Sequence, residues 1–499
     1  MTDKKHEDVG TIFRALDAVV ATDVAMGLAV TSPFDGVVIA RIAEDSISTL
    51  EEKITHARAA QEAWYILPRA LRAAAIEKLA AAVTHHRERL AQLIHLEAGK
   101  TMKEALAEVD GSADILLKTV KDATLPEMGG MLRCKERPPV GVVGLITSFN
   151  FPLAVANWTI APALLAGNSV LWKPSEKTPL TALGYKAVFD SAMGTFADLV
   201  QIVTGGRDIG TALVAHERID MISATGSVAM GKGIKEALVK KRNRDIKPIL
   251  ELGGNNGVII SNKLSPAHLE WSLGSLMNSF LGTSGQRCTN TRRLIVYADI
   301  CDQVITGLQK QIGDFLAGGA EAWEKFGYGA LIDEDAYKRF ERAKRQVVAE
   351  GGKIFFGQRL REKEYPDAYY IEPTLALLPT HSSIMHEETF APLLFITPYK
   401  GDIMEAIKLV NAPGNAGLVN GIYTQNQSEA DAFAAHNQAG HSVINSPKGT
   451  GTPAFGMGFG GNKDSGEGEI LNAADPLRAF TRDTHFSRIA QNKDVAMDC

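Results

Sequence analysis

One cysteine lies in a loop whose composition suits nucleophilic chemistry. Cys288 follows Gly282-Thr-Ser-Gly-Gln-Arg287 and precedes the strand-like run 293–297. Glycines such as Gly282 and Gly285 let a backbone come close to a bound molecule. Arg287 adjoins the thiol in sequence and favours the thiolate, the form that attacks carbonyl carbons. Because a lone cysteine is more often a buried structural residue, the loop alone leaves both interpretations open.

A glutamate upstream has a setting that suits a general base. Glu251 lies between Leu250 and Leu252 and is followed by two glycines. Apolar surroundings disfavour the carboxylate, so we expect a raised pKa, which suits a group that takes a proton near neutral pH. Cys288 and Glu251 together therefore predict acyl chemistry at a thiol, assisted by a base.

These two stretches resemble the aldehyde dehydrogenase superfamily, in which a Gly-Gln-x-Cys loop and a Glu-Leu-Gly-Gly turn face each other. The matching stretches here are 285–288 and 251–254, and the similarity covers roughly residues 30–490. It implies oxidation of an aldehyde to a carboxylate with reduction of NAD or NADP. In that scheme Cys288 forms a thiohemiacetal and then a thioester, and Glu251 activates the water that hydrolyses the thioester. Several motifs are similar to the antiquitin-like branch, whose members oxidise an aminoadipate-type semialdehyde.

The resemblance adds Asn150 to the same site. Thr147-Ser-Phe-Asn-Phe-Pro152 resembles the family's Thr-Pro-Trp-Asn-Phe-Pro, with Ser148 and Phe149 as departures. It implies that the Asn150 amide and the backbone N–H of Cys288 stabilise the oxyanion that forms during attack. Without the resemblance, Asn150 would equally well be a turn residue before a proline.

Further positions follow from the resemblance at the aldehyde pocket. The residues expected to line it are Phe151, Trp158, Arg287, Thr289 and Phe459. For the aromatic members, ordinary core packing is the alternative. The family often has a glutamate where this chain has Ile470. The resemblance therefore does not imply a proton relay that runs through a second glutamate at this position.

A glycine-rich stretch suits phosphate binding. Gly226-Ser-Val-Ala-Met-Gly-Lys-Gly233 follows a strand pattern and opens a helix pattern. The free N–H groups and the dipole of a helix N-terminus attract anions. The stretch nearly fits a P-loop, but Gly233 stands where a hydroxyl for Mg²⁺ is needed, and no GxGxxG follows the first strand. A plain glycine-rich helix start is the alternative. The resemblance implies that Thr225, Gly226 and Ser227 contact the cofactor pyrophosphate.

Two more motifs imply the cofactor. Trp-Lys173-Pro-Ser-Glu176 resembles the stretch that binds the adenosine ribose in the family. A carboxylate there repels a 2′-phosphate, so NAD is preferred, while Lys173 and Ser175 leave room for NADP. The Glu388–Pro392 stretch resembles the motif that holds the nicotinamide ribose and ring. The expected cofactor residues are Thr147, Lys173, Ser175, Glu176, Gly206, Gly210, Thr225, Gly226, Ser227, Leu252, Glu388 and Phe390.

The elements that must position these residues alternate between strand and helix. Strand patterns at 141–147, 168–173, 199–204, 219–224 and 247–252 have helical patterns between them. This predicts a parallel sheet with helices on both faces. A second alternating series begins after Gly254. Upstream, 47–100 reads as helix broken at Pro68, and 101–120 continues as helix.

The fold prediction is therefore α/β: a Rossmann-like parallel-sheet cofactor domain, a second α/β catalytic domain and a small β oligomerisation element. We expect the cofactor domain at 1–122 and 141–253 with part of 455–475. The catalytic domain would be 254–454. The oligomerisation element would be 123–140 and 476–499. In the family such segments pair between subunits, which implies a homo-oligomer, dimer or tetramer.

Composition excludes several classes of function. The 499 residues are 45% hydrophobic and 22% charged, and the net charge of −5 argues against a binder of nucleic acid or anionic membranes. Four scattered cysteines without zinc-site spacing predict no metal and a reducing, cytoplasmic location. We expect no signal peptide and no membrane span. Two rival functions are a cofactor-independent thiol hydrolase and a non-catalytic structural relative.

Overall fold

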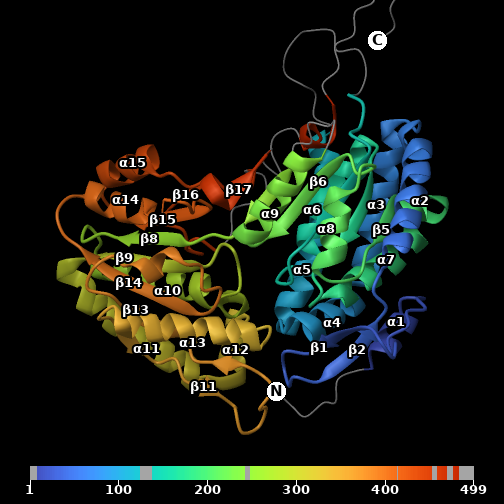
Figure 1. Cartoon of the computed structure of the whole chain (residues 1–499). Coiled ribbons are helices and arrows are strands. Elements are labelled where there is room, and N and C mark those ends of the chain that lie inside the picture. Colours follow the sequence, from blue (N-terminus) through green and yellow to red (C-terminus); the bar gives the residue numbers. More distant parts are fainter. Residues whose placement is uncertain are drawn as a thin grey trace, which may run out of the picture.

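The computed structural model describes residues 8–123, 137–241, 248–412, 414–451, 458–468 and 476–482. Its helices and strands form two groups, each built round one large sheet (Figure 1). The helices are α1 (Val9–Arg14), α2 (Ile47–Tyr65), α3 (Arg69–His85), α4 (Arg87–Ala98), α5 (Met102–Ala123), α6 (Ala154–Ala166), α7 (Pro179–Met193), α8 (Arg207–Ala215), α9 (Val228–Lys240), α10 (Pro266–Leu281), α11 (Cys301–Ala317), α12 (Gly319–Phe326), α13 (Glu334–Ala349), α14 (Ile403–Asn411) and α15 (Gln427–His436).

The strands are β1 (Leu28–Thr31), β2 (Val38–Ile42), β3 (Val142–Ile146), β4 (Ser169–Lys173), β5 (Val200–Ile202), β6 (Met221–Gly226), β7 (Ile249–Leu252), β8 (Asn256–Ile260), β9 (Thr291–Tyr297), β10 (Lys353–Phe355), β11 (Arg359–Leu360), β12 (Tyr370–Ile371), β13 (Thr374–Leu377), β14 (Leu393–Tyr399), β15 (Val419–Tyr423), β16 (His441–Ile444) and β17 (Gly466–Glu467).

The N-terminal helices begin and end where local signals place them. The Ser46 hydroxyl accepts from the Thr49 N–H and the Thr49 hydroxyl accepts from the Ser46 N–H, a capping box that starts α2. Pro68 separates α2 from α3, as expected. Further breaks at His86 and Gly99 divide the predicted helix again. Gly99 has a φ of 69°, the left-handed conformation that ends many helices.

The first sheet confirms the predicted parallel arrangement. Its order is β17-β7-β6-β3-β4-β5; β17 is antiparallel to β7 and the other neighbouring pairs are parallel. From the central β3 the chain adds β4 and β5 on one side and β6 and β7 on the other. Ligands of such sheets bind beyond the carboxyl ends of the strands at this switch point. The segments after β3 and β6 hold Asn150 and the Gly226–Ser227 turn.

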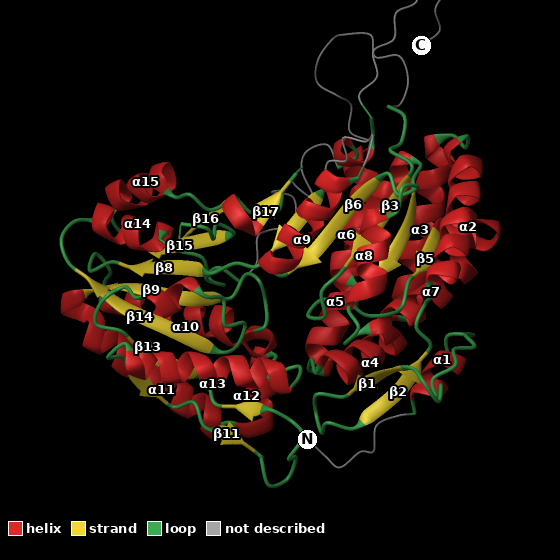
Figure 2. Cartoon of the chain, viewed as in Figure 1, coloured by secondary structure: helices red, strands yellow, loops and turns green. Residues whose placement is uncertain are grey.

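The second sheet follows directly from the first through residues 253–255. Its order is β10-β13-β14-β9-β8-β15-β16, parallel except for the β10 edge. Val258 and Ile260 pack against α10 and α11, whereas Ile259 packs against α14 and α15. This alternation is the period of two expected of a strand with both faces buried. Figure 2 shows helices on both faces of this sheet.

The C-terminal part departs from the sequence prediction. Residues 466–467 form β17 on the edge of the first sheet, where the sequence analysis predicted no strand. Within the predicted β oligomerisation element, residues 478–480 form a short 3₁₀ turn and Thr481 makes an isolated bridge with Pro139. Residues 124–136 and 483–499 of the predicted oligomerisation element, and Ile470, lie outside the described residues. The three-part domain division stays a prediction.

Within the ranges that the structure describes, no helix is both long enough and apolar enough to cross a membrane.

Candidate active site

The structure brings the Glu251 turn against the Cys288 loop. The Asn256 Nδ2 donates to the backbone oxygen of Cys288 at 2.7 Å. At Gly254, a Cβ atom would lie 2.6 Å from that same oxygen, so only glycine allows this approach. The two stretches that the sequence analysis paired are therefore in direct contact, where the first sheet passes into the second.

The cysteine loop is held in an unusual backbone conformation. Thr283 and Ser284 have φ angles of 50° and 53°, left-handed values that cost non-glycine residues energy. A Cβ at Gly285 would lie 2.4 Å from the Ala391 carbonyl carbon, and one at Gly282 would lie 2.9 Å from the Arg287 guanidinium carbon. The loop glycines were expected to admit a ligand. They instead admit other parts of this chain.

Cys288 is surrounded by groups that raise and lower its pKa. Burial raises the pKa of the thiol to about 12, with further raising by Glu388 and then Glu251, while Arg292 lowers it. Arg287 was expected to favour the thiolate, but its guanidinium pairs with Glu104. Arg292 is the cation that acts on the sulfur.

Glu251 has the buried setting that its neighbours predict. It is 6% exposed on β7, and burial raises the pKa of its carboxyl well above the usual value. Its Oε2 is buried with no hydrogen-bond partner among the described residues. A carboxyl group whose pKa is raised by burial, and which has an acceptor atom without a partner among the described residues, is suited to take a proton from water or from a thiol.

Asn150 lies where its amide reaches the cysteine loop. It is 5% exposed in the segment after β3. Its Nδ2 donates to the Gln286 carbonyl oxygen at 2.9 Å, and its Oδ1 accepts from the Ser148 hydroxyl at 2.7 Å. The amide therefore has one N–H fixed on the loop two residues before the thiol, and the second N–H is the candidate oxyanion donor.

The predicted pocket residues fall into two groups. Trp158 and Phe459 pack together with ring centroids 5.1 Å apart, in one apolar cluster with Cys288. Phe151 lies under the Lys100 ammonium at 3.5 Å and near the Arg287 guanidinium. Thr289, next to the thiol, is buried.

Lys100 belongs to a buried ion pair that supports the Asn150 segment. Its Nζ lies 2.6 Å from Glu108 Oε2, and both side chains are 1% exposed. The other Glu108 oxygen accepts from the N–H groups of Leu153 and Ala154 at 2.9 and 3.1 Å, capping α6 just after Asn150. A carboxylate at a helix N-terminus is favoured by the free N–H groups and the dipole. This pair was not predicted from the sequence.

The candidate cofactor residues gather at the carboxyl edge of the first sheet. Gly226 ends β6, and Ser227 caps α9 by accepting from the Met230 N–H at 3.1 Å. Thr225 precedes them, and Leu252 packs against Gly231 of α9. The helix N-terminus that the glycines predicted is therefore present, in a position that suits a phosphate.

The neighbouring β4 segment has a buried amine and an exposed carboxylate. Lys173 is 5% exposed, and burial lowers the pKa of its amine. Its Nζ lies 3.7 Å from Glu176, whose side chain is 48% exposed. Gly210 of α8 lies against the Lys173 stem, and Gly206 caps α8 with open space around its Cα. Ser175, two residues after β4, accepts a hydrogen bond from the Lys177 N–H through its hydroxyl. Thr147, just after β3, accepts one from the Trp172 indole through its hydroxyl.

The Glu388 motif joins the site from the second sheet. Glu388 Oε1 accepts from the Gly254 N–H at 3.2 Å and lies 3.4 Å from Arg292. Phe390 has a left-handed φ of 54°, and its ring lies under the Arg292 guanidinium and against Phe149. These residues lie beside the Cys288 loop. Their place at the nicotinamide end of the cofactor site stays a prediction.

Three residues that the sequence analysis missed organise the loop. Asn256 donates to both the Cys288 and Asn290 carbonyl oxygens. Asn290 Oδ1 accepts from the Arg287 N–H at 2.6 Å. Arg292, 1% exposed, donates to the Gly285 and Arg287 carbonyl oxygens at 3.0 and 2.7 Å. An arginine at the start of a buried strand was the available signal, because a buried cation requires partners.

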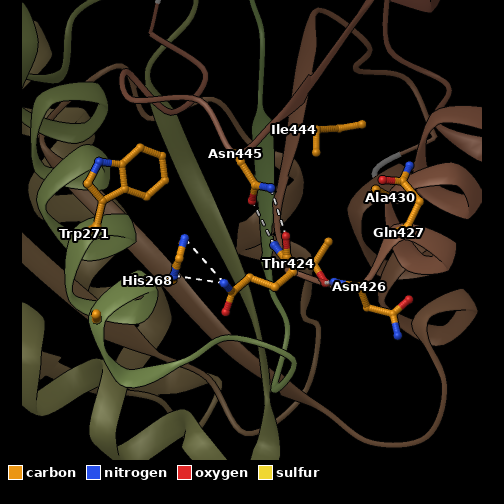
Figure 3. Close-up of a pocket in the computed structure, with 10 residues that line it drawn as sticks. His268, Trp271, Thr424, Asn426, Gln427, Ala430, Ile444 and Asn445 are labelled. Carbon is orange, nitrogen blue, oxygen red and sulfur yellow. Dashed lines mark hydrogen bonds between the residues drawn. The ribbon is translucent and has the colours of Figure 1, made fainter.

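A wide hollow elsewhere does not belong to this site. It has a volume of about 710 Å³ and lies between the start of α10 and the ends of β15 and β16 (Figure 3). His268 and Gln425 hydrogen-bond across it, beside the partly exposed Trp271. None of the site residues predicted from the sequence lines it.

Comparison with known proteins gives a consistent result. The profile of the aldehyde dehydrogenase family matches residues 20–486. An alpha-aminoadipic semialdehyde dehydrogenase from Bos taurus is 30% identical over 458 residues, 89% of this chain and 82% of the relative. Lactaldehyde dehydrogenase from Escherichia coli is 28% identical, with a TM-score of 0.82 over 92% of this chain and 95% of the other. Betaine aldehyde dehydrogenase from Staphylococcus aureus, in complex with NAD⁺, is 25% identical, with a TM-score of 0.83 over 95% of both chains.

Proposed function

The chain belongs to the aldehyde dehydrogenase family, and on that premise we propose which of its residues carry the reaction. The protein is an NAD(P)-dependent enzyme that oxidises an aldehyde to a carboxylate through a catalytic cysteine. We assign the nucleophile to Cys288, the general base to Glu251 and the oxyanion donor to Asn150. The observation that carries this assignment is the contact between the Gly254 turn and the Cys288 backbone.

The chemistry of these side chains follows from their setting. The Cys288 thiol gives up its proton and its sulfur bonds to the aldehyde carbon, while the Asn150 amide and the Cys288 N–H stabilise the oxyanion. When bound, the nicotinamide would supply the acceptor for the hydride that leaves the former aldehyde carbon, so that a thioester on Cys288 remains. Glu251 then takes a proton from the water that attacks the thioester, which releases the carboxylate and restores the thiol. A raised pKa places Glu251 where it can both take and release that proton.

We assign cofactor binding to the carboxyl edge of the first sheet. The capped N-terminus of α9 is suited to a pyrophosphate, because the free N–H groups and the dipole of a helix N-terminus attract anions. Lys173 and Glu176 would hold the adenosine ribose, and Glu388 would hold the second ribose beside the Cys288 loop. The observed clustering of these groups on both sides of residues 253–254 supports the assignment.

Cofactor preference should depend on Glu176. We expect NAD to have the higher kcat/KM, and Glu176→Gln to narrow the NAD/NADP ratio about tenfold, because the repulsion of a 2′-phosphate is relieved. The ratio is measured by steady-state NADH and NADPH formation. Glu405→Gln is the matched control, since Glu405 forms an exposed pair with Lys408 at the same i,i+3 spacing. A wild-type enzyme that prefers NADP would show that Lys173 and Ser175 outweigh the carboxylate.

We further propose that the substrate is a semialdehyde with a carboxylate at its far end. The similarity to an alpha-aminoadipic semialdehyde dehydrogenase supports this class. An aldehyde panel assayed by NADH formation tests it, with each semialdehyde compared with the uncharged aldehyde of the same chain length. We expect the semialdehyde of each pair to have a kcat/KM about tenfold higher than that of the uncharged aldehyde, and equal values would contradict the assignment.

The same assays test the two rival functions. Hydrolysis of a thioester or ester without aldehyde oxidation would favour the cofactor-independent thiol hydrolase, and no turnover would favour the structural relative.

We also propose a homo-oligomer, dimer or tetramer, in the cytoplasm. The resemblance, which implies that 123–140 and 476–499 pair between subunits, supports the first part, and four scattered cysteines support the second. Light scattering coupled to gel filtration would measure the oligomeric state.

A further inference from the structure

We propose that His441 is a positioning residue that sets the aromatic wall of the aldehyde pocket. The inference rests on the proposed function, because that function places Phe459 and Trp158 beside the reacting aldehyde. His441 is the first residue of β16, the edge strand of the second sheet. The sequence analysis did not single it out.

Three rings lie in a row next to the nucleophile. The imidazole of His441 stacks on Phe459 with centroids 5.3 Å apart and planes 24° from parallel. Phe459 in turn packs against Trp158 at 5.1 Å. Phe459 and Trp158 share an apolar cluster with Cys288. Trp158 is carried by α6, which packs on the first sheet, so the row joins the two halves of the molecule across the wall of the site.

A hydrogen bond fixes the backbone behind the wall. The Gly460 N–H donates to His441 Nε2 at 3.3 Å. The imidazole must then be neutral, with its proton on Nδ1, because a protonated ring has no acceptor. Burial lowers the pKa of His441, which keeps the ring in that form at neutral pH. The side chain therefore contacts both the ring and the following peptide of the same short segment.

The surrounding backbone leaves this segment little freedom. A Cβ at Gly440 would lie 2.0 Å from the Gly460 carbonyl oxygen, so the two chains are in close contact immediately before His441. The Asn462 N–H donates to the Gly417 carbonyl oxygen at 2.8 Å, and so does the Gly440 N–H at 2.9 Å. Phe459 thus belongs to a segment that is anchored at Asn462. In our proposal, stacking on the His441 imidazole sets the orientation of the Phe459 ring relative to Trp158.

The experiment compares His441→Ala, which removes the ring and the acceptor, with His441→Phe, which restores only the ring. In acetaldehyde only one methyl group can contact the aromatic rings, whereas in hexanal a chain of five carbons can contact them. For each variant, KM and kcat are measured with both aldehydes. A second readout needs no cofactor: protection of Cys288 from iodoacetamide by hexanoate, followed by mass spectrometry. His436→Ala is the control, because His436 is an exposed histidine that ends the neighbouring α15.

We expect His441→Ala to raise the KM for hexanal about tenfold and to weaken protection by hexanoate by a similar factor, with kcat changed less than about twofold. His441→Phe should show about half of the logarithmic increase in the KM for hexanal that His441→Ala shows. His436→Ala should have the same KM as the wild type. If the wild type oxidises both aldehydes and His441→Ala has the same KM values as the wild type, this inference alone is overturned. A proportional loss of kcat with both aldehydes would also overturn it, since that indicates general damage. A wild-type enzyme that oxidises neither these two aldehydes nor the semialdehydes of the panel would overturn the proposed function together with it.

Discussion

Cys288→Ala is expected to remove aldehyde oxidation, with kcat lowered on the order of 10⁶-fold. The substitution removes the only atom that can bond to the aldehyde carbon in the proposed reaction. The residues assigned to the cofactor stay intact. NADH formation should therefore fall to background, while cofactor binding, followed by quenching of tryptophan fluorescence, should keep a similar Kd.

Cys301→Ala is the matched control for this variant. Cys301 is also a free cysteine, and it is buried, but it starts α11, which follows β9, whereas the Cys288 loop precedes β9. Its replacement should leave kcat unchanged. Retained turnover in Cys288→Ala would remove the thiol from the mechanism, and lost turnover in Cys301→Ala would point to damage that any buried cysteine can cause.

Glu251→Gln is expected to separate the two halves of the reaction. If Glu251 acts only on the hydrolytic water, the variant should form about one NADH per active site in a burst, and steady-state turnover should fall about 10²–10⁴-fold. Rapid-mixing absorbance measures the burst, and mass spectrometry of denatured samples should find an acyl adduct on Cys288. If Glu251 also takes the thiol proton, the burst itself should slow, and higher pH should restore it as the thiolate forms without help.

The pH dependence of hydrolysis gives a further check on Glu251. Burial raises the pKa of its carboxyl, so the group is protonated and inactive as a base below that pKa. In the wild type, the hydrolytic rate should rise with pH as the carboxylate forms, and this rise should be absent in Glu251→Gln. Glu467→Gln is the control, because Glu467 lies opposite Leu250 on the adjacent β17 and faces solvent. Wild-type turnover without an adduct in Glu251→Gln would make Glu251 a structural acid.

Local patterns in the sequence were sufficient for most of the first half of the fold. β3, β4, β5 and β7 each lie within a predicted strand, and β6 overlaps the one predicted at 219–224, because short apolar runs bounded by turn residues are a local signal. The break at Pro68 follows from the missing N–H and the fixed φ of proline, which are independent of context. The two-residue β17 was missed, because it is defined by its partner β7 and not by its own composition.

The chemistry of Glu251 could likewise be inferred from residue types, since its neighbours in sequence are also its neighbours in space. The leucines beside Glu251 are buried with it, and so the raised pKa of its carboxyl was predictable. Cofactor motifs such as Gly226–Ser227 were recognisable because a strand end and a helix start are contiguous in the chain.

Only the tertiary structure decided which groups meet across the chain. Arg287 adjoins the thiol in sequence, yet it pairs with Glu104 of α5, and Arg292 from β9 is the cation that acts on Cys288. The loop glycines accommodate residues 287 and 391 of this chain, a consequence of packing two sheets together. His441 reaches Phe459 only because β16 and the glycine-rich segment are brought side by side. Side-chain direction and long-range packing determine these pairs, and neither is encoded in the spacing of residues along the chain.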